Sequence, residues 1–386
     1  MKKRLLALAL GMVLLLPGCA AMLERSHVSS TAHVDYAVEE DESILRAETY
    51  QGLVKSMLYF VNGHRGSGVI RLYNYTGDVE TDLASARDEV LQDPVGAFAV
   101  GALNYDSTRI LAYYEVQLTI TYTHSMREIE AIPEVTGLSG VRQELARMVR
   151  EQKTSTVFLS SYFSGDGEMV RELLYLACMS APELAAHHDW NYWPVSVTLY
   201  PETGTRRIIE VGLPQLTADR IEAEKQYAQE LETAAAAILE ANPPAGEAYT
   251  VEELAAIVRA AHGGYDPYGT DAALGALTGE PVEVRGAVLA MEYLCQQCGI
   301  ETEFVSGTGV EWLIVAAPGG WRHLMSAMLF GPEEGVEWKG IPAEPFRLFT
   351  DQELLELDGG YEWDMALYPA CVDEEVQALS QDARQG

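Results

Sequence analysis

The chain has 386 residues, of which 48% are hydrophobic, 58 are acidic and 26 are Lys or Arg. A net charge of −32 would repel nucleic acid and an anionic membrane surface, so we expect no nucleic-acid partner. A chain of this length is expected to build more than one hydrophobic core, and five cysteines are too few for a disulfide framework.

The first residues have the pattern of a bacterial lipoprotein signal. Lys2-Lys3-Arg4 is followed by an apolar run over residues 5–16, which ends at Leu16-Pro17-Gly18-Cys19. The run is shorter than the roughly 20 apolar residues of a transmembrane helix and fits a secretory signal peptide. Its last four residues resemble a lipobox, which implies cleavage after residue 18 and a lipid, palmitate included, on Cys19. An ordinary secretory signal that happens to precede a cysteine is the alternative.

We therefore expect a signal peptide over residues 1–18 and a polar tether over residues 19–42. The lipid on Cys19 would hold the protein at the extracytoplasmic face of the cell membrane. The anchor would be stable, because stable anchoring needs more than one acyl chain and lipoproteins carry at least two. Loss of residues 1–18 removes three basic residues and no acidic one, which lowers the net charge from −32 to −35.

Residues 43–212 are predicted to form a duplicated α/β region, because two stretches repeat one order of elements. The first copy is predicted as a helix over 44–62, a strand over 68–73, a helix over 78–93 and a hairpin of 97–105 and 109–122 that turns at Asp106-Ser107. The second is predicted as a helix over 141–152, a strand over 156–159, a helix over 167–187 that is interrupted near Pro182, and strands over 195–200 and 207–211.

A helical connector is predicted over residues 213–246, where Ala and Glu are frequent and helix breakers are few up to residue 241. Pro243-Pro244 ends it. Thr250 and Glu253 form a capping box for a further helix to about His262. Residues 373–386 are expected to be an acidic tail.

Three further features have a functional interpretation and a structural one. Cys295 and Cys298 have CxxC spacing, but they fall in a helical pattern without a second CxxC, so two packed thiols are favoured over a redox pair or a disulfide to Cys371. His187-His188-Asp189-Trp190 could bind a metal, but the segment follows a helix end, where histidine is favoured by the dipole. Trp190, Tyr192 and Trp193 could form a carbohydrate or peptide platform, or pack at a domain junction. We expect no metal and no cofactor.

The C-terminal third carries six short motifs in a fixed order. They are Tyr265-Asp266 with the following turn to Leu277, the helix from Arg285 to Cys295 with Gly299-Ile300, Phe304-Val305-Ser306-Gly307, Glu311-Trp312-Leu313-Ile314-Val315, Gly320-Trp321-Arg322-His323, and the closing Phe349-Thr350-Asp351, Tyr361-Glu362-Trp363-Asp364 and Tyr368-Pro369-Ala370-Cys371. Together they resemble the transglutaminase-like superfamily, in its bacterial surface-protein branch. The resemblance implies an α+β fold with a papain/transglutaminase-like domain over residues 247–372.

The resemblance also implies a Cys-His-Asp triad, with the cysteine at a helix N-terminus where its thiol pKa is lowered. Carried over position by position, the three places are held by Val284, Val310 and Met325. All three are apolar. Loss of the nucleophile alone lowers the rate of a triad enzyme by a factor on the order of 10⁶. The pattern therefore indicates a pseudoenzyme.

Two functions follow from this resemblance. In the first, the former active-site groove, lined by Arg285, Glu311, Trp312, Trp321 and His323, binds a peptide or cell-wall polymer, or serves as a scaffold. In the second, the protein is an active transglutaminase, a cysteine-protease-like enzyme or another hydrolase that uses a non-standard site near His323. Any nucleophile or set of metal ligands that faces Val284 would favour the second.

Overall fold

The computed structural model describes residues 36–38, 42–185, 195–214, 216–331, 341, 344–357 and 360–372. Cys19, most of the predicted tether, the segment from His187 to Trp193 and the predicted acidic tail lie outside these residues. The chain has an α+β fold and divides into two compact units, residues 1–131 and 132–386. No helix among the described residues has the length and apolar character needed to cross a membrane.

The first unit is a mixed five-stranded sheet with helices. Its strand order is β1-β2-β3-β5-β4, in which β2 and β3 are parallel and the other neighbours are antiparallel. The elements are β1 (Tyr36–Val38), β2 (Ile44–Ala47), α2 (Tyr50–Asn62), β3 (Ser67–Tyr73), α3 (Val79–Leu91), α4 (Pro94–Ala99), β4 (Val100–Ile110), β5 (Tyr113–Tyr122) and α5 (Met126–Glu130).

Three predicted boundaries in this unit are wrong, one of them at residues 97–99, which belong to helix α4 and not to the first strand of the hairpin. Residues 44–47 form a strand and not the start of a helix, because Leu45 and Ala47 alternate into the core while the strand pairs with β3. The helix begins after Thr49, whose hydroxyl accepts a hydrogen bond from the Gly52 amide. The predicted hairpin is present, but it turns between Ile110 and Tyr113 rather than at Asp106, which pairs within the ladder.

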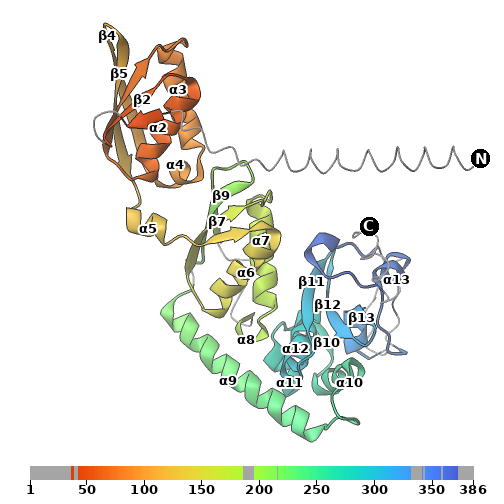
Figure 1. Ribbon diagram of the computed structural model, residues 1–386. Helices are drawn as coiled ribbons and strands as arrows, with labels where there is room; N and C mark the ends of the chain where they lie inside the picture. Colours follow the sequence, from red (N-terminus) through yellow and green to blue (C-terminus); the bar gives the residue numbers. More distant parts are fainter. Residues whose placement is uncertain are drawn as a thin grey trace, which may run out of the picture. The chain divides into compact units, whose positions relative to one another are not determined.

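The second unit begins with an α/β layer of the same topology. Its sheet has the order β6-β7-β9-β8, with β6 and β7 parallel and the other pairs antiparallel, as in β2-β3-β5-β4. The elements are β6 (Glu134–Thr136), α6 (Gly137–Arg150), β7 (Ser155–Ser161), α7 (Gly167–Met179), α8 (Pro182–Ala185), β8 (Ser196–Tyr200) and β9 (Arg206–Gly212). Figure 1 shows α6 and α7 side by side next to this sheet.

The chain divides between the two layers because their cores differ. Residues of the first layer, such as Phe60 and Ile70, form a core of their own. Phe158 and Leu174 of the second layer belong to a core that continues through the C-terminal part to Cys371. The two layers therefore share a topology, but the first has a core of its own and the second shares its core with the C-terminal part.

The C-terminal part follows a long connecting helix. The connector is helical as predicted, with α9 beginning after Thr217, and the predicted capping box of Thr250 and Glu253 begins α10. The elements are α9 (Ala218–Ala241), α10 (Val251–Ala261), β10 (Tyr265–Thr270), α11 (Ala273–Thr278), α12 (Val284–Gln297), the antiparallel sheet β11 (Thr302–Gly307), β12 (Val310–Ala317) and β13 (Gly320–Leu324), and then η1 (Ser326–Leu329), α13 (Asp351–Leu355) and η2 (Met365–Leu367).

Helix α12 is the most enclosed element of this part. Ten of its 14 residues, from Gly286 to Cys295, are buried. It packs against α8, α10, α11, β11, β12 and η1, and Figure 1 shows it among them. Gly286 allows this packing, because a Cβ there would lie 2.6 Å from the Thr270 carbonyl oxygen.

We predict that Phe60→Ala destabilises the first unit by about 3–5 kcal/mol and leaves the second unchanged, because Phe60 is wholly buried in the separate core. Differential scanning calorimetry of the full-length protein should show one of two transitions moving to lower temperature. The matched variant Phe158→Ala should move the other. Equal shifts of both transitions by either variant would contradict the separation of the cores.

Candidate functional site

The three triad positions of the resemblance lie at the ends of three elements. Val284 is the first residue of α12 and Val310 the first of β12. Met325 directly follows β13 and caps η1. Met325 is buried, and the two valines are partly buried against the same core. All three side chains therefore contribute to packing.

None of the four described cysteines has the electrostatic surroundings of a nucleophile. Cys178, Cys295 and Cys371 are buried and Cys298 is partly buried, and all are free thiols. Burial raises the pKa of each, in Cys371 to about 12. A catalytic thiol needs a lowered pKa, so these side chains are kept as neutral thiols.

A charged cluster lies at the first turn of α12. It consists of Arg285 of α12, Glu311 of β12 and Tyr175 of α7 and is called here the Arg285 cluster. Arg285 Nη2 donates to Glu311 Oε1 at 2.9 Å, and its Nε lies 3.1 Å from Oε2. The Tyr175 hydroxyl donates to the same Oε1 at 2.6 Å. Glu311 follows Val310 on β12, so the two side chains point to opposite faces. The side chain that reaches the start of α12 is thus that of Glu311.

The electrostatics of this cluster favour a fixed ion pair. Burial opposes the charge on Arg285, but the hydrogen bonds and charge of Glu311 outweigh it and raise the pKa of the guanidinium. Burial, followed by the neighbouring Glu311 carboxylate, raises the pKa of Tyr175. Arg285 therefore stays charged and Tyr175 stays protonated at physiological pH. Because Tyr175 comes from α7, its hydrogen bond connects the second α/β layer to Glu311 of β12.

His323 lies in a separate buried network. Trp312 Nε1 donates to His323 Nδ1 at 2.9 Å, so that nitrogen accepts and Nε2 carries the hydrogen. His323 Nε2 donates to Asp351 Oδ1 at 2.9 Å, and Asp351 Oδ2 accepts from the Cys371 amide at 2.9 Å. His323 has no exposed surface. Both ring nitrogens are occupied, and the network joins β12 and β13 to α13 and the residues around Cys371.

The same residues form a group of potential metal ligands. Single donor atoms of His323, Asp351 and Cys371 lie within 4.8 Å of one another. However, the two ring nitrogens of His323 already make hydrogen bonds to Trp312 and Asp351, and the Cys371 thiol is protonated. The donors are thus used for internal bonding.

Four of the five residues of the predicted groove are divided between these two clusters. Arg285 and Glu311 form the ion pair at the start of α12. Trp312 and His323 are buried in the other network, where they line no open surface. Trp321 is partly buried and lies two residues before His323 on β13. The segment from His187 to Trp193 is outside the described residues.

Sequence reasoning missed Tyr175 and the role of Asp351. Asp351 lies in the closing motif, but nothing in the spacing shows that it binds His323, 28 residues away. Tyr175 lies in a helix of the second layer, and no local pattern links it to Glu311. No protein-family model matches this chain, and no curated protein matches it.

We predict that Asp351→Asn lowers the stability of the second unit by about 2–3 kcal/mol, because an amide nitrogen would face either the His323 N–H or the Cys371 N–H. Chemical denaturation followed by tryptophan fluorescence measures the change. The control is Asp364→Asn, an exposed helix cap that asparagine can also make. Equal stabilities of the two variants would contradict the network.

Proposed function

We propose that this protein is a lipid-anchored bacterial cell-surface protein whose C-terminal domain is a catalytically degenerate transglutaminase-like domain. It acts by binding a peptide or cell-wall polymer, or as a scaffold, and not by catalysis. The lipid on Cys19 attaches it to the extracytoplasmic face of the membrane. The strong negative charge agrees with a body that stands away from anionic surfaces.

The observation that carries this proposal is the start of α12. The helix begins at Val284, where the family has its thiol, so the most favourable place for an ionised nucleophile holds an apolar side chain. Arg285 in the same turn is paired with Glu311, whose carboxylate also accepts a hydrogen bond from Tyr175. A reacting carbonyl would meet valine and a fixed ion pair there.

The alternative, an enzyme that uses His323, is less well supported. An acid or base must reach its substrate within hydrogen-bond distance. His323 is wholly buried, and each ring nitrogen is bonded to a buried partner. Catalysis by this ring would require the network around Asp351 to open.

We predict that the purified full-length protein shows no turnover above background with a glutamine-containing peptide and a primary amine. Release of ammonia and incorporation of the amine measure transfer and hydrolysis together. Iodoacetamide should label Cys298 before the three buried cysteines, because it alone among the described cysteines is partly exposed. Turnover that is lost in Cys298→Ser or His323→Gln would show that the protein is an enzyme.

The anchor makes a separate prediction. Intact-mass analysis of the membrane fraction should show a chain that starts at Cys19 and carries at least two acyl groups, since one chain holds a protein only marginally. Cys19→Ser should move the protein to the soluble fraction. A mature chain without lipid in the membrane fraction would contradict the anchor.

A further inference from the structure

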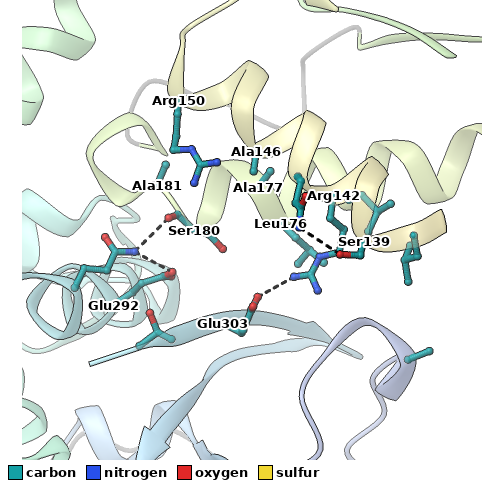
Figure 2. Close-up of a pocket in the computed structure, with 16 residues that line it drawn as sticks. Ser139, Arg142, Ala146, Arg150, Leu176, Ala177, Ser180, Ala181, Glu292 and Glu303 are labelled. Atoms are coloured by element: carbon teal, nitrogen blue, oxygen red, sulfur yellow. Dashed lines mark hydrogen bonds and ion pairs between the residues drawn. The ribbon is translucent and has the colours of Figure 1, made fainter. Parts of the chain in front are cut away.

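A pocket of about 480 Å³ lies between the second α/β layer and the C-terminal part, away from the Arg285 cluster. Its walls come from α6, α7, α12 and β11 (Figure 2). All four elements belong to the second unit. A volume of this size is within the range of small-molecule and peptide sites.

Glu292 is the unusual residue of this pocket. It is on α12 and has no exposed surface, yet Oε2 has no hydrogen-bond partner among the described residues. Its Oε1 receives a long hydrogen bond, 3.4 Å, from Gln296 Nε2, which also donates to the Ser180 carbonyl oxygen at 3.2 Å. Gln296 is exposed. A buried polar atom without a partner is costly and rare in native structures, and the exposed Gln296 side chain is the one that contacts this carboxyl group.

The charges around Glu292 are predominantly negative. Glu303 of β11 and Glu183 of α8 both act on it electrostatically. Burial, and then these two carboxylates, raise the pKa of Glu292 well above its usual value. The raised pKa favours the protonated form of this side chain. An ammonium group beside it would favour the carboxylate instead.

The lining also carries two cations, Arg142 and Arg150. Arg142 of α6 is engaged by Glu303 at 2.8 Å and by the Leu367 carbonyl oxygen. Arg150, in the last turn of α6, is exposed and makes no ion pair with any residue in the part of the chain that the structure describes. Part of the wall is apolar, with Leu173, Leu176 and Ala177 of α7.

From this arrangement we propose that the pocket binds a short peptide by its free amino terminus, with the ammonium on Glu292, the carboxylate near Arg150 and an apolar side chain against Leu173 and Leu176. On binding, Gln296 moves aside and Glu292 gives its proton to solvent, so that the carboxylate and the ammonium form a buried ion pair. The inference rests on the proposed binding function and names its ligand class.

The proton released gives binding a characteristic pH dependence. Because the pKa of Glu292 is raised, ionising it costs less as the pH rises, and affinity should increase from pH 5.5 to pH 7.5. Above that range the ammonium of the peptide begins to lose its proton, with an ordinary pKa of about 8. Glu303 and Glu183 favour the ammonium throughout, while Arg142 stays paired with Glu303.

The experiment uses the full-length protein in detergent and an equimolar library of tripeptides with free termini. Bound peptides are separated by size exclusion and identified by mass spectrometry, and the best-retained peptide is then measured by calorimetry at pH 5.5 and 7.5. We expect amino-terminal acetylation to weaken binding by about tenfold or more, because it removes the charged hydrogen bond to Glu292. Glu292→Gln should have the same effect and should remove the pH dependence.

Two matched controls separate the pocket from general changes. Glu224→Gln changes another buried glutamate, on α9, whose pKa burial raises to about 7 and which does not line the pocket. It should bind as the unmodified protein does. Arg150→Ala should weaken peptides with a free carboxylate and leave their carboxamides unchanged, whereas Lys153→Ala, a nearby exposed cation outside the lining, should have no effect.

Retention of no tripeptide would overturn the inference, as would equal binding of acetylated peptides or of the Glu292→Gln variant. These results leave the non-catalytic function standing, provided that turnover is absent. Conversely, a retained tripeptide that is cut or joined to an amine would support the pocket and overturn the non-catalytic function.

Discussion

The burial of α12 on almost every side is the constraint on which the second unit depends. A helix that is apolar all around must be covered all around, and no single layer can do this. The sheet β11–β13 covers part of it, α10 and α11 cover another part, and α8 of the second α/β layer completes the enclosure. The C-terminal part therefore shares one core with the second layer, and residues as distant as Leu174 and Leu324 belong to it.

This constraint also explains why two layers of one topology have different roles. Both have the strand pattern of two parallel strands followed by an antiparallel hairpin. In the first layer the apolar faces of the helices are buried within the layer, so that unit has its own core. In the second layer α7 sends Tyr175 to Glu311 and α6 sends Arg142 to Glu303. The second layer and the C-terminal part are thus joined by these polar contacts as well as by the shared apolar core. The polar contacts fix the position of α7 on the C-terminal part.

Much of the fold could be predicted where local signals were strong. The capping box at Thr250 and the hairpin of β8 and β9 follow from cap chemistry and strand alternation, and the helix from Arg285 was expected from the resemblance. The strand at Ile44 could not, because four residues before a helix share its apolar pattern, and only pairing with β3 decides between the two. The site was harder still. Asp351 and Tyr175 reach their partners through tertiary contacts that no spacing encodes. Glu292 did give a signal, a single carboxylate within an apolar helical run, but its meaning depends on what faces it.

The shared core has a practical consequence for dividing this protein. A fragment that starts at the connector, near residue 213, would leave the apolar surface of α12 and α9 uncovered where α8 and the second layer pack, and such exposed patches promote aggregation. A fragment that starts at residue 132 keeps that surface covered, because the contacts divide there. Fragments for crystallisation or genetic fusion should therefore keep the second layer together with the C-terminal part. This holds although the second layer has the same topology as the first.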